Sequence, residues 1–139
     1  MSEVLANASC VAIGGRAVLI EGEPGSGKSS LALALIDRGA MLIGDDGVIL
    51  EEREGRLWAA PPPNIAGLLE VRNVGLVTLP TCAAPLALVI RFDADAPRAV
   101  DVAERVERRG HALPLVPLYP ASTALPLRAE FALKVHGLR

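Results

Sequence analysis

A glycine-rich stretch carries the clearest chemical signal in this chain of 139 residues. Residues 22–29 read Gly-Glu-Pro-Gly-Ser-Gly-Lys-Ser and fit the pattern G-x-x-x-x-G-K-[ST] of a phosphate-binding loop, the P-loop. Its glycines let the backbone curl, so that successive N–H groups converge on one anion at the start of a helix. Lys28 can then reach the β- and γ-phosphates, and the Ser29 hydroxyl can bind Mg²⁺. A chance glycine-rich turn is the alternative. The predicted nucleotide-binding residues are Gly22, Glu23, Pro24, Gly25, Ser26, Gly27, Lys28, Ser29 and Ser30.

The segments on either side of this loop fit the setting in which a P-loop works. Residues 16–20 are mainly apolar and predict a buried strand, and residues 30–36 predict a helix. That helix is expected to end at Arg38 and Gly39, because glycine is a common stop signal just past a helix. A strand, a loop and a helix in this order favour nucleotide-phosphate binding over a chance turn.

Two adjacent carboxylates, Asp45 and Asp46, directly follow an apolar strand predicted over residues 40–43. In folds of this kind the carboxyl ends of neighbouring strands point toward the bound phosphates. A carboxylate placed there can bind Mg²⁺ or accept the proton of an attacking hydroxyl. The sequence Asp-Asp-Gly also suits a β-turn. From the residues alone, a catalytic and a purely structural role both remain open.

A second acidic candidate, Glu70, lies two positions before Arg72. Residues two apart on a strand share a face, so an exposed ion pair between these side chains is the default interpretation. A functional carboxylate is the alternative.

Composition limits the fold and the partners. A chain of this length predicts one domain over residues 1–139, and the aromatic content of 3% predicts an aliphatic core. The net charge of -2 gives no electrostatic reason to expect nucleic acid or an anionic membrane, and no apolar run is long enough for a membrane span. Cys10 and Cys82 lack metal or redox spacing, which favours reduced thiols and a cytoplasmic location.

The remaining patterns predict an α/β fold. Residues 86–92 are nearly all apolar, as expected for a central strand buried on both faces. Residues 98–109 are interpreted as an amphipathic helix whose charged side chains lie on a solvated face. Two prolines in residues 113–118 predict an edge strand. The other expected elements are a strand at 11–13, a hairpin formed by 48–50 and 56–59, a break at 61–63, and a helix after 122.

Three blocks of this sequence together resemble the catalytic domain of HPr kinase/phosphorylase. The first is residues 14–31, with the P-loop. The second is residues 42–48, Leu-Ile-Gly-Asp-Asp-Gly-Val, which is similar to the family's Leu-Val-Ala-Asp-Asp-x-Val. The third is residues 68–76, which is similar to the family's Leu-Glu-x-Arg-Gly-Leu-Gly signature. The likeness is good over residues 7–79 and looser beyond.

This resemblance implies a fold and an activity. The chain looks like the short α-proteobacterial variant, which lacks the family's separate N-terminal domain. The implied fold is a P-loop kinase of the phosphoenolpyruvate carboxykinase-like type, with a mixed central sheet and flanking helices. Members phosphorylate a serine of HPr, a small carrier protein of the phosphotransferase system, and reverse the reaction with inorganic phosphate. The implied ligands are ATP and Mg²⁺, and the implied assembly is a homo-oligomer, a hexamer in the long-form members.

The resemblance also implies roles for individual residues. Lys28 of the P-loop would act on the transferred phosphoryl group, while Ser29 and Glu70 would hold Mg²⁺. Asp45 would be the general base for the acceptor serine. The remaining two catalytic residues would be Asp46, which supports the metal or the base, and Arg72, which lines the site and contacts the partner.

The chain departs from the family pattern at four places. Asn7 replaces a histidine, Ser30 replaces an acidic residue, Asn73 replaces a glycine of the signature, and the downstream arginine loop has no clear counterpart. An asparagine side chain can form hydrogen bonds but cannot titrate. The alternative hypothesis is therefore a nucleotide-binding regulatory module with reduced or lost catalysis. A small-molecule kinase is disfavoured because no arginine-rich lid is recognisable, and a GTPase because no Asn-Lys-x-Asp motif is present.

Overall fold

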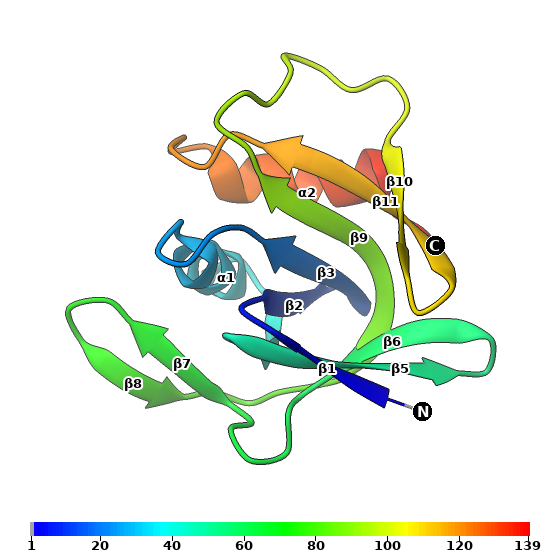
Figure 1. Ribbon diagram of the computed structural model, residues 1–139. Coiled ribbons are helices and arrows are strands. Elements are labelled where there is room, and N and C mark those ends of the chain that lie inside the picture. Colours follow the sequence, from blue (N-terminus) through cyan, green and yellow to red (C-terminus); the bar gives the residue numbers. More distant parts are fainter. Residues whose placement is uncertain (1) are drawn as a thin grey trace.

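The computed structural model describes residues 2–139, which fold into strands and two helices (Figure 1). The elements are β1 (Ser2–Ala6), β2 (Ser9–Ile13), β3 (Arg16–Glu21), α1 (Lys28–Asp37), β4 (Met41–Gly44), β5 (Gly47–Arg53), β6 (Arg56–Ala60), β7 (Leu68–Val71), β8 (Gly75–Thr78), β9 (Ala84–Phe92), β10 (Glu104–Arg108), β11 (His111–Leu118) and α2 (Leu125–His136). None of the helices in this range is long and apolar enough to cross a membrane.

A curled, mixed sheet of nine strands forms the body of the molecule. Its order is β1-β5-β6-β9-β3-β2-β4, with β11 also pairing with β9 and β10 with β11. The central strands β3, β9 and β11 are parallel to one another, so they end at the same edge, where the P-loop begins. Strands β7 and β8 form a separate hairpin. The α/β class with a mixed sheet, predicted from the sequence, is confirmed.

Two aliphatic clusters hold the fold together, one on each face of the sheet. Both helices cover one face, where Leu35 of α1 and Ala129 of α2 belong to the same cluster as Ile90 of β9. On the other face the sheet curls over a second cluster that includes Leu19 and Val89. Burying such a leucine or isoleucine stabilises the fold by roughly 1.5–3 kcal/mol relative to exposure. These clusters fix the sheet edge that carries the P-loop.

Several predicted elements are confirmed. The strands at 11–13, 16–20, 40–43 and 86–92 are present, and the segment from Ala84 to Ile90 is almost wholly buried. The P-loop helix spans Lys28–Asp37, and the last helix carries Pro126 in its first turn, where the missing N–H has no partner to lose.

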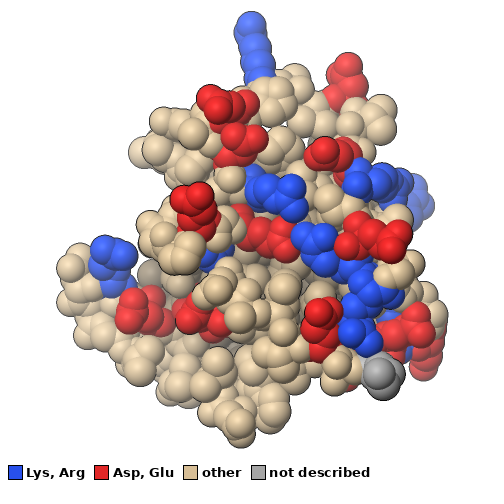
Figure 2. Space-filling view, viewed as in Figure 1, with Lys and Arg blue, Asp and Glu red and all other residues tan. Residues whose placement is uncertain are grey.

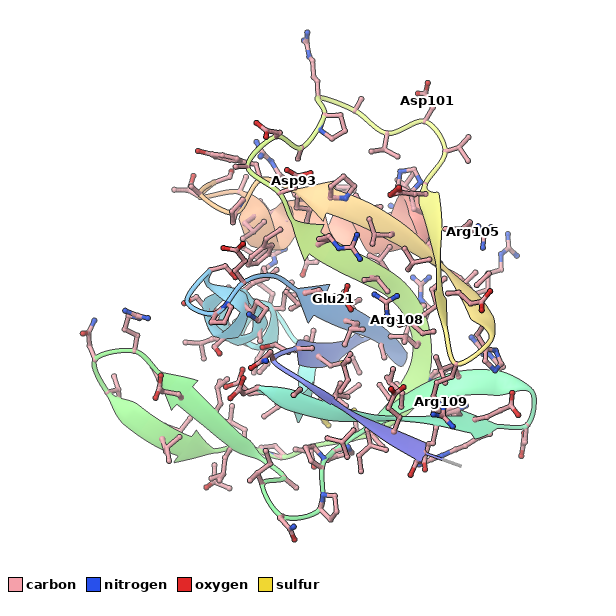
Figure 3. The ribbon with its side chains drawn as sticks, in the orientation of Figure 1. Glu21, Asp93, Asp101, Arg105, Arg108 and Arg109 are labelled. Carbon is pink, nitrogen blue, oxygen red and sulfur yellow. The ribbon has the colours of Figure 1, made fainter. Side chains whose placement is uncertain are left out.

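The predicted helix over residues 98–109 is wrong. Residues 104–108 form β10, and the two-residue turn Arg109-Gly110 leads into β11. Both turn residues have positive φ, 50° and 80°, which is the geometry of a tight hairpin turn. The charged face expected on the helix is also wrong in part, because Arg108 and Arg109 form ion pairs with Glu21 and Glu3 (Figure 3).

The predicted edge position of residues 113–118 is wrong as well, since β11 pairs with a strand on each side. Its first part pairs with β10 and its last part with β9. Pro114 lies outside the part paired with β9, and Pro117 lies outside the part paired with β10. Each proline therefore directs its ring nitrogen, which cannot donate, to an unpaired side.

Acidic and basic side chains are interleaved over the face seen in Figure 2. This mixture agrees with the small net charge of -2 and leaves no extended area of one sign on that face.

Candidate functional site

The P-loop joins the end of β3 to the start of α1. Gly25 and Gly27 adopt φ of 77° and 103°, which side chains with a Cβ rarely tolerate. Gly27 caps α1 without any side-chain hydrogen bond, so the N–H groups of the first turn stay available to an anion. A Cβ on Gly22 would lie 2.7 Å from the Ser26 Oγ, which explains the glycine that opens the loop. The loop has the geometry of a phosphate cradle.

Lys28 is held inside this loop. Its side chain is 8% exposed, and its Nζ donates hydrogen bonds to the backbone oxygens of Gly22 at 2.8 Å and Glu23 at 2.9 Å. Both acceptors are neutral carbonyls. The ammonium charge is consequently positioned without being neutralised by a carboxylate, and it remains available to an incoming phosphate.

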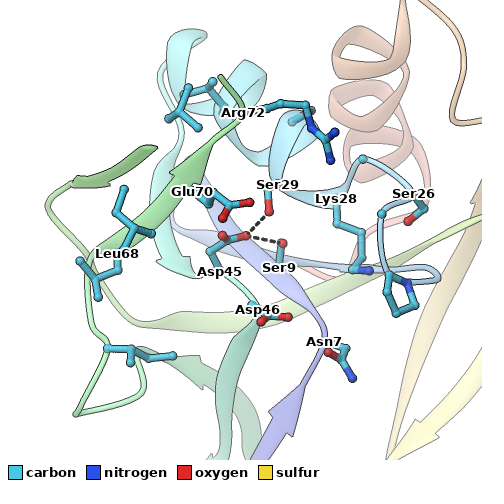
Figure 4. Close-up of a pocket in the computed structure, with 18 residues that line it drawn as sticks. Asn7, Ser9, Ser26, Lys28, Ser29, Asp45, Asp46, Leu68, Glu70 and Arg72 are labelled. Carbon is cyan, nitrogen blue, oxygen red and sulfur yellow. Dashed lines mark hydrogen bonds between the residues drawn. The ribbon is translucent and has the colours of Figure 1, made fainter. Parts of the chain in front are cut away.

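Asp45 joins the P-loop to β2 (Figure 4). Its Oδ1 accepts hydrogen bonds from the Ser29 Oγ at 2.6 Å and from the Ser9 Oγ at 2.9 Å. Ser9 is 1% exposed, and sequence analysis did not select it. A polar residue opening an otherwise apolar strand was the available signal. These bonds place a carboxylate beside the hydroxyl that the P-loop pattern assigns to Mg²⁺.

The tight turn between β4 and β5 presents both aspartates. Asp46 is exposed and adopts a φ of 58°, and its backbone oxygen accepts a hydrogen bond from the Asn7 N–H at 3.3 Å. Asn7 also has a positive φ, 60°. Figure 4 shows both side chains at the pocket, on the side of Asp45 away from the β7–β8 hairpin. Asp45 and Asp46 therefore form the tight turn that the sequence suggested, and the same turn presents both carboxylates to the pocket.

The turn itself depends on Gly44. A Cβ there would lie 2.1 Å from the Gly47 backbone oxygen, far inside van der Waals contact. We expect Gly44→Ala to lower the free energy of unfolding by about 1–3 kcal/mol, as overpacking does, measured by urea denaturation.

Gly47→Ala is the matched control at the other end of the turn. Its new Cβ would meet no atom closer than 3.7 Å, an ordinary contact, so a small change is expected. Equal losses in the two variants would contradict the steric explanation.

The separate β7–β8 hairpin completes the site. Glu70 lies on β7, and Arg72 lies in the turn that follows. The default interpretation, an ion pair between these side chains, finds no support, because neither forms a salt bridge within residues 2–139. Figure 4 shows the Glu70 carboxylate near Ser29 and Asp45. A hairpin far along the chain thus brings a second carboxylate to the P-loop.

One pocket of about 660 Å³ brings these groups together. It contains every predicted site residue except Gly22 and Glu23, whose backbone oxygens accept the hydrogen bonds from Lys28. Its apolar lining, which sequence analysis did not predict, comprises Leu33, Ile65, Leu68, Val71 and Leu76. The volume lies within the range of ligand sites.

The oxygen donors in this pocket suit Mg²⁺. No group of three or more His, Cys, Asp or Glu side chains in residues 2–139 forms a complete protein metal site. Magnesium is usually bound by one or two carboxylates together with substrate phosphates and waters. Ser29, Asp45 and Glu70 supply a hydroxyl and two carboxylates of this kind.

Neither cysteine lines this pocket. Cys10 is fully buried next to Ser9, and burial raises the pKa of its thiol. Burial also raises the pKa of Cys82. Cys10 belongs to one of the two core clusters, and Cys82 packs against that cluster.

Comparisons with known proteins identify related sequences. The sequence model described as the HPr serine kinase C-terminal domain matches residues 1–82. The HPr kinase/phosphorylase of Clostridium tetani is 46% identical over 67 residues, 48% of this chain and 22% of that protein. The protein of the same name from Streptococcus thermophilus is 46% identical over 68 residues, with the same coverages. The chain therefore spans about a fifth of these curated relatives.

A solved structure extends the likeness over the fold. The HPr(Ser) kinase/phosphatase from Coxiella burnetii superimposes with a TM-score of 0.81 at 27% sequence identity, covering 95% of this chain and 88% of that one. The match includes the C-terminal half, where the sequence resemblance is loose. With the family model matching more than half of its residues, this chain belongs to the HPr serine kinase C-terminal domain family.

Proposed function

We propose that this chain is the catalytic domain of a Mg²⁺- and ATP-dependent serine kinase acting on HPr or an HPr-like phosphocarrier protein. The same site would phosphorolyse the phosphoserine with inorganic phosphate. The observation that carries the proposal is the 2.6 Å bond from the Ser29 hydroxyl to Asp45, with Asp46 in the same pocket. This hydrogen bond places a pair of carboxylates beside a phosphate-binding loop. Phosphoryl transfer to a hydroxyl requires such a loop for the phosphates, together with carboxylates that bind the metal and accept the proton of the hydroxyl. The names of the relatives support HPr as the acceptor.

The contacts favour a metal-side role for Asp45. This carboxylate already accepts the Ser29 hydroxyl, so it faces the position that the P-loop pattern assigns to the cation. Ser29, Asp45 and Glu70 would hold Mg²⁺, which when bound neutralises the charge that develops on the phosphates. The family resemblance also places Ser29 and Glu70 on the metal, but it makes Asp45 the general base and Asp46 a support for the metal or the base.

Asp46 is then the general base. It is exposed in the pocket and accepts no side-chain hydrogen bond from residues 2–139, so its carboxylate can accept the proton of the acceptor serine. The serine oxygen forms a bond to the γ-phosphorus, the bond to the β–γ bridging oxygen breaks, and ADP leaves. Lys28 stabilises the transferred group. In reverse, an oxygen of inorganic phosphate forms a bond to the phosphoserine phosphorus, and the bond from that phosphorus to the serine oxygen breaks. Protonated Asp46 returns its proton to the serine oxygen, and pyrophosphate leaves.

Asn7 favours one alternative function. Its side chain lies beside the proposed base but cannot exchange a proton. A nucleotide-binding regulatory module would keep the P-loop and Lys28 while turning over slowly or not at all.

The proposal extends to location and assembly. A kinase of HPr would work in the cytoplasm, where phosphocarrier proteins operate by family resemblance. We also infer a homo-oligomer, a hexamer by the same resemblance. Exposed apolar side chains on α2, Phe131 at 59% and Val135 at 69%, support self-association.

A phosphotransfer assay tests the function. Purified protein is incubated with γ-labelled ATP, Mg²⁺ and each HPr-like protein of the same organism, and inorganic phosphate is added afterwards. We expect label on a serine of one such protein, and its release as pyrophosphate when phosphate is added.

Asn7→His separates the two candidate functions. If the wild-type protein binds ATP but transfers nothing, and the histidine variant does transfer, the regulatory module is supported. Robust wild-type turnover excludes that alternative, whereas failure of both proteins with every HPr paralogue overturns the kinase proposal.

A further inference from the structure

A carboxylate stands directly before the phosphate loop. Glu21 is the last residue of β3, and its side chain accepts hydrogen bonds from Arg91 and Arg108. Figure 3 shows Glu21 beside Arg108. Arg108 donates from Nη2 to both carboxylate oxygens at 2.9 Å, and Arg91 approaches Oε1 at 3.3 Å. The side chains of Glu21 and Arg108 are 19% and 24% exposed, so this pair is partly shielded from water, unlike an ordinary surface pair.

This position matters for an anion-binding loop. The next residue, Gly22, supplies the carbonyl that holds the Lys28 ammonium. A negative charge on the residue that precedes a phosphate loop opposes binding of a polyphosphate unless cations neutralise it. Glu21, Arg91 and Arg108 together carry a net charge of +1. The cluster as a whole therefore attracts a polyphosphate, whereas Glu21 alone would repel it.

The β10–β11 hairpin delivers Arg108 to this place from 87 positions away. Side chains alternate along β10, so Arg108 shares the face of Val106, which packs against the core cluster. The next residue, Arg109, forms an ion pair with Glu3 of β1 at 3.7 Å. Arg105 lies on the opposite face of β10, is exposed, and forms no salt bridge within residues 2–139.

We propose that Arg108 is a positioning residue for nucleotide binding, which acts through its charge by neutralising Glu21, the residue directly before the P-loop. The inference rests on the proposed binding of Mg-ATP to that loop. It assigns to β10 a role in nucleotide affinity, although the strand lines no part of the pocket.

Two single variants that break the same ion pair provide the test. Arg108→Gln leaves the Glu21 charge less neutralised, so the Kd of Mg-ATP should rise. Glu21→Gln removes the negative charge that neutralises Arg91 and Arg108, so the local charge becomes more positive and the Kd of Mg-ATP should fall. From Coulomb's law in screened solvent, each change should be roughly two- to fivefold. The double variant restores the wild-type net charge and should bind as the wild-type protein does. Affinity is measured by calorimetry at low and at physiological salt.

A purely structural role gives a different pattern. If the pair only braces the loop, both single variants lose the brace and both weaken binding, which would overturn the proposal. Arg105→Gln removes the same charge from the other face of β10 and should change the Kd less than Arg108→Gln does; an equal effect would also overturn it. If Arg108→Gln does not fold, Arg108→Lys keeps the charge and should bind nearly as well as wild type. Failure of the wild-type protein itself to bind Mg-ATP would instead overturn the proposed function, and this inference with it.

Discussion

Phosphotransfer should be lost when Lys28 is replaced by alanine. The buried ammonium is held by the two loop carbonyls at 2.8 and 2.9 Å, and no other cation occupies the P-loop itself. Removing one charged donor from a transition-state site typically costs about 10²–10³-fold in rate. We expect a loss of kcat/KM of this size, with weaker binding of Mg-ATP, measured in the γ-labelled ATP assay and by calorimetry.

The chain offers a direct control. Lys134, the other lysine, is exposed on α2 and lies outside the pocket, so Lys134→Ala should leave both measurements unchanged. If Lys28→Ala retained activity while the fold and thermal stability were intact, the loop would not be the site of phosphoryl transfer.

The second large effect separates the two aspartates. Asp46→Asn removes the proposed base and should lower kcat by about 10²–10⁴-fold while Mg-ATP binding stays nearly unchanged. Asp45→Asn keeps a hydrogen-bond acceptor for Ser29 but loses the charge on the metal side. It should raise the Mg²⁺ concentration needed for half-maximal activity by about 10–100-fold.

Magnesium titrations at saturating ATP distinguish these outcomes, because added Mg²⁺ should recover activity in the Asp45 variant and leave the Asp46 variant inactive. The opposite result would restore the division implied by the family resemblance, with Asp45 as the base.

The spacing of the glycines predicted the backbone geometry of the P-loop at residues 22–29, because positions with positive φ such as Gly25 and Gly27 favour glycine. The strand before it and the helix after it followed from apolar periodicity. The pairing of Ser9 with Asp45 could not be predicted in this way, because it depends on β2 and β4 becoming neighbours in the sheet. The same limit applies to Glu70, whose approach to the site is set by the packing of a hairpin.

Residues 98–109 show how a pattern can mislead. Val100, Ala103 and Val106 recur at helical spacing, yet the Arg109-Gly110 turn and pairing with β11 decided the local structure. Tertiary pairing outweighed a weak periodicity. Reading the segment as a helix also placed Arg108 on a solvated face, which concealed its contact with Glu21. The single-domain organisation and the individual roles of the site residues remain predictions.

The two carboxylates proposed to bind the metal, Asp45 and Glu70, are carried by two separate sheets. Asp45 belongs to the cooperative unit formed by the main sheet, whereas Glu70 stands on two short strands that share no backbone ladder with it. Local opening of such a unit requires less free energy than global unfolding. Although β7 also packs against α1, we expect this hairpin to open at a lower free energy than the main sheet, which would move Glu70 away from Asp45. A cation held between them would act as a cross-link between the two units, so the ordering of the hairpin would become part of the binding equilibrium.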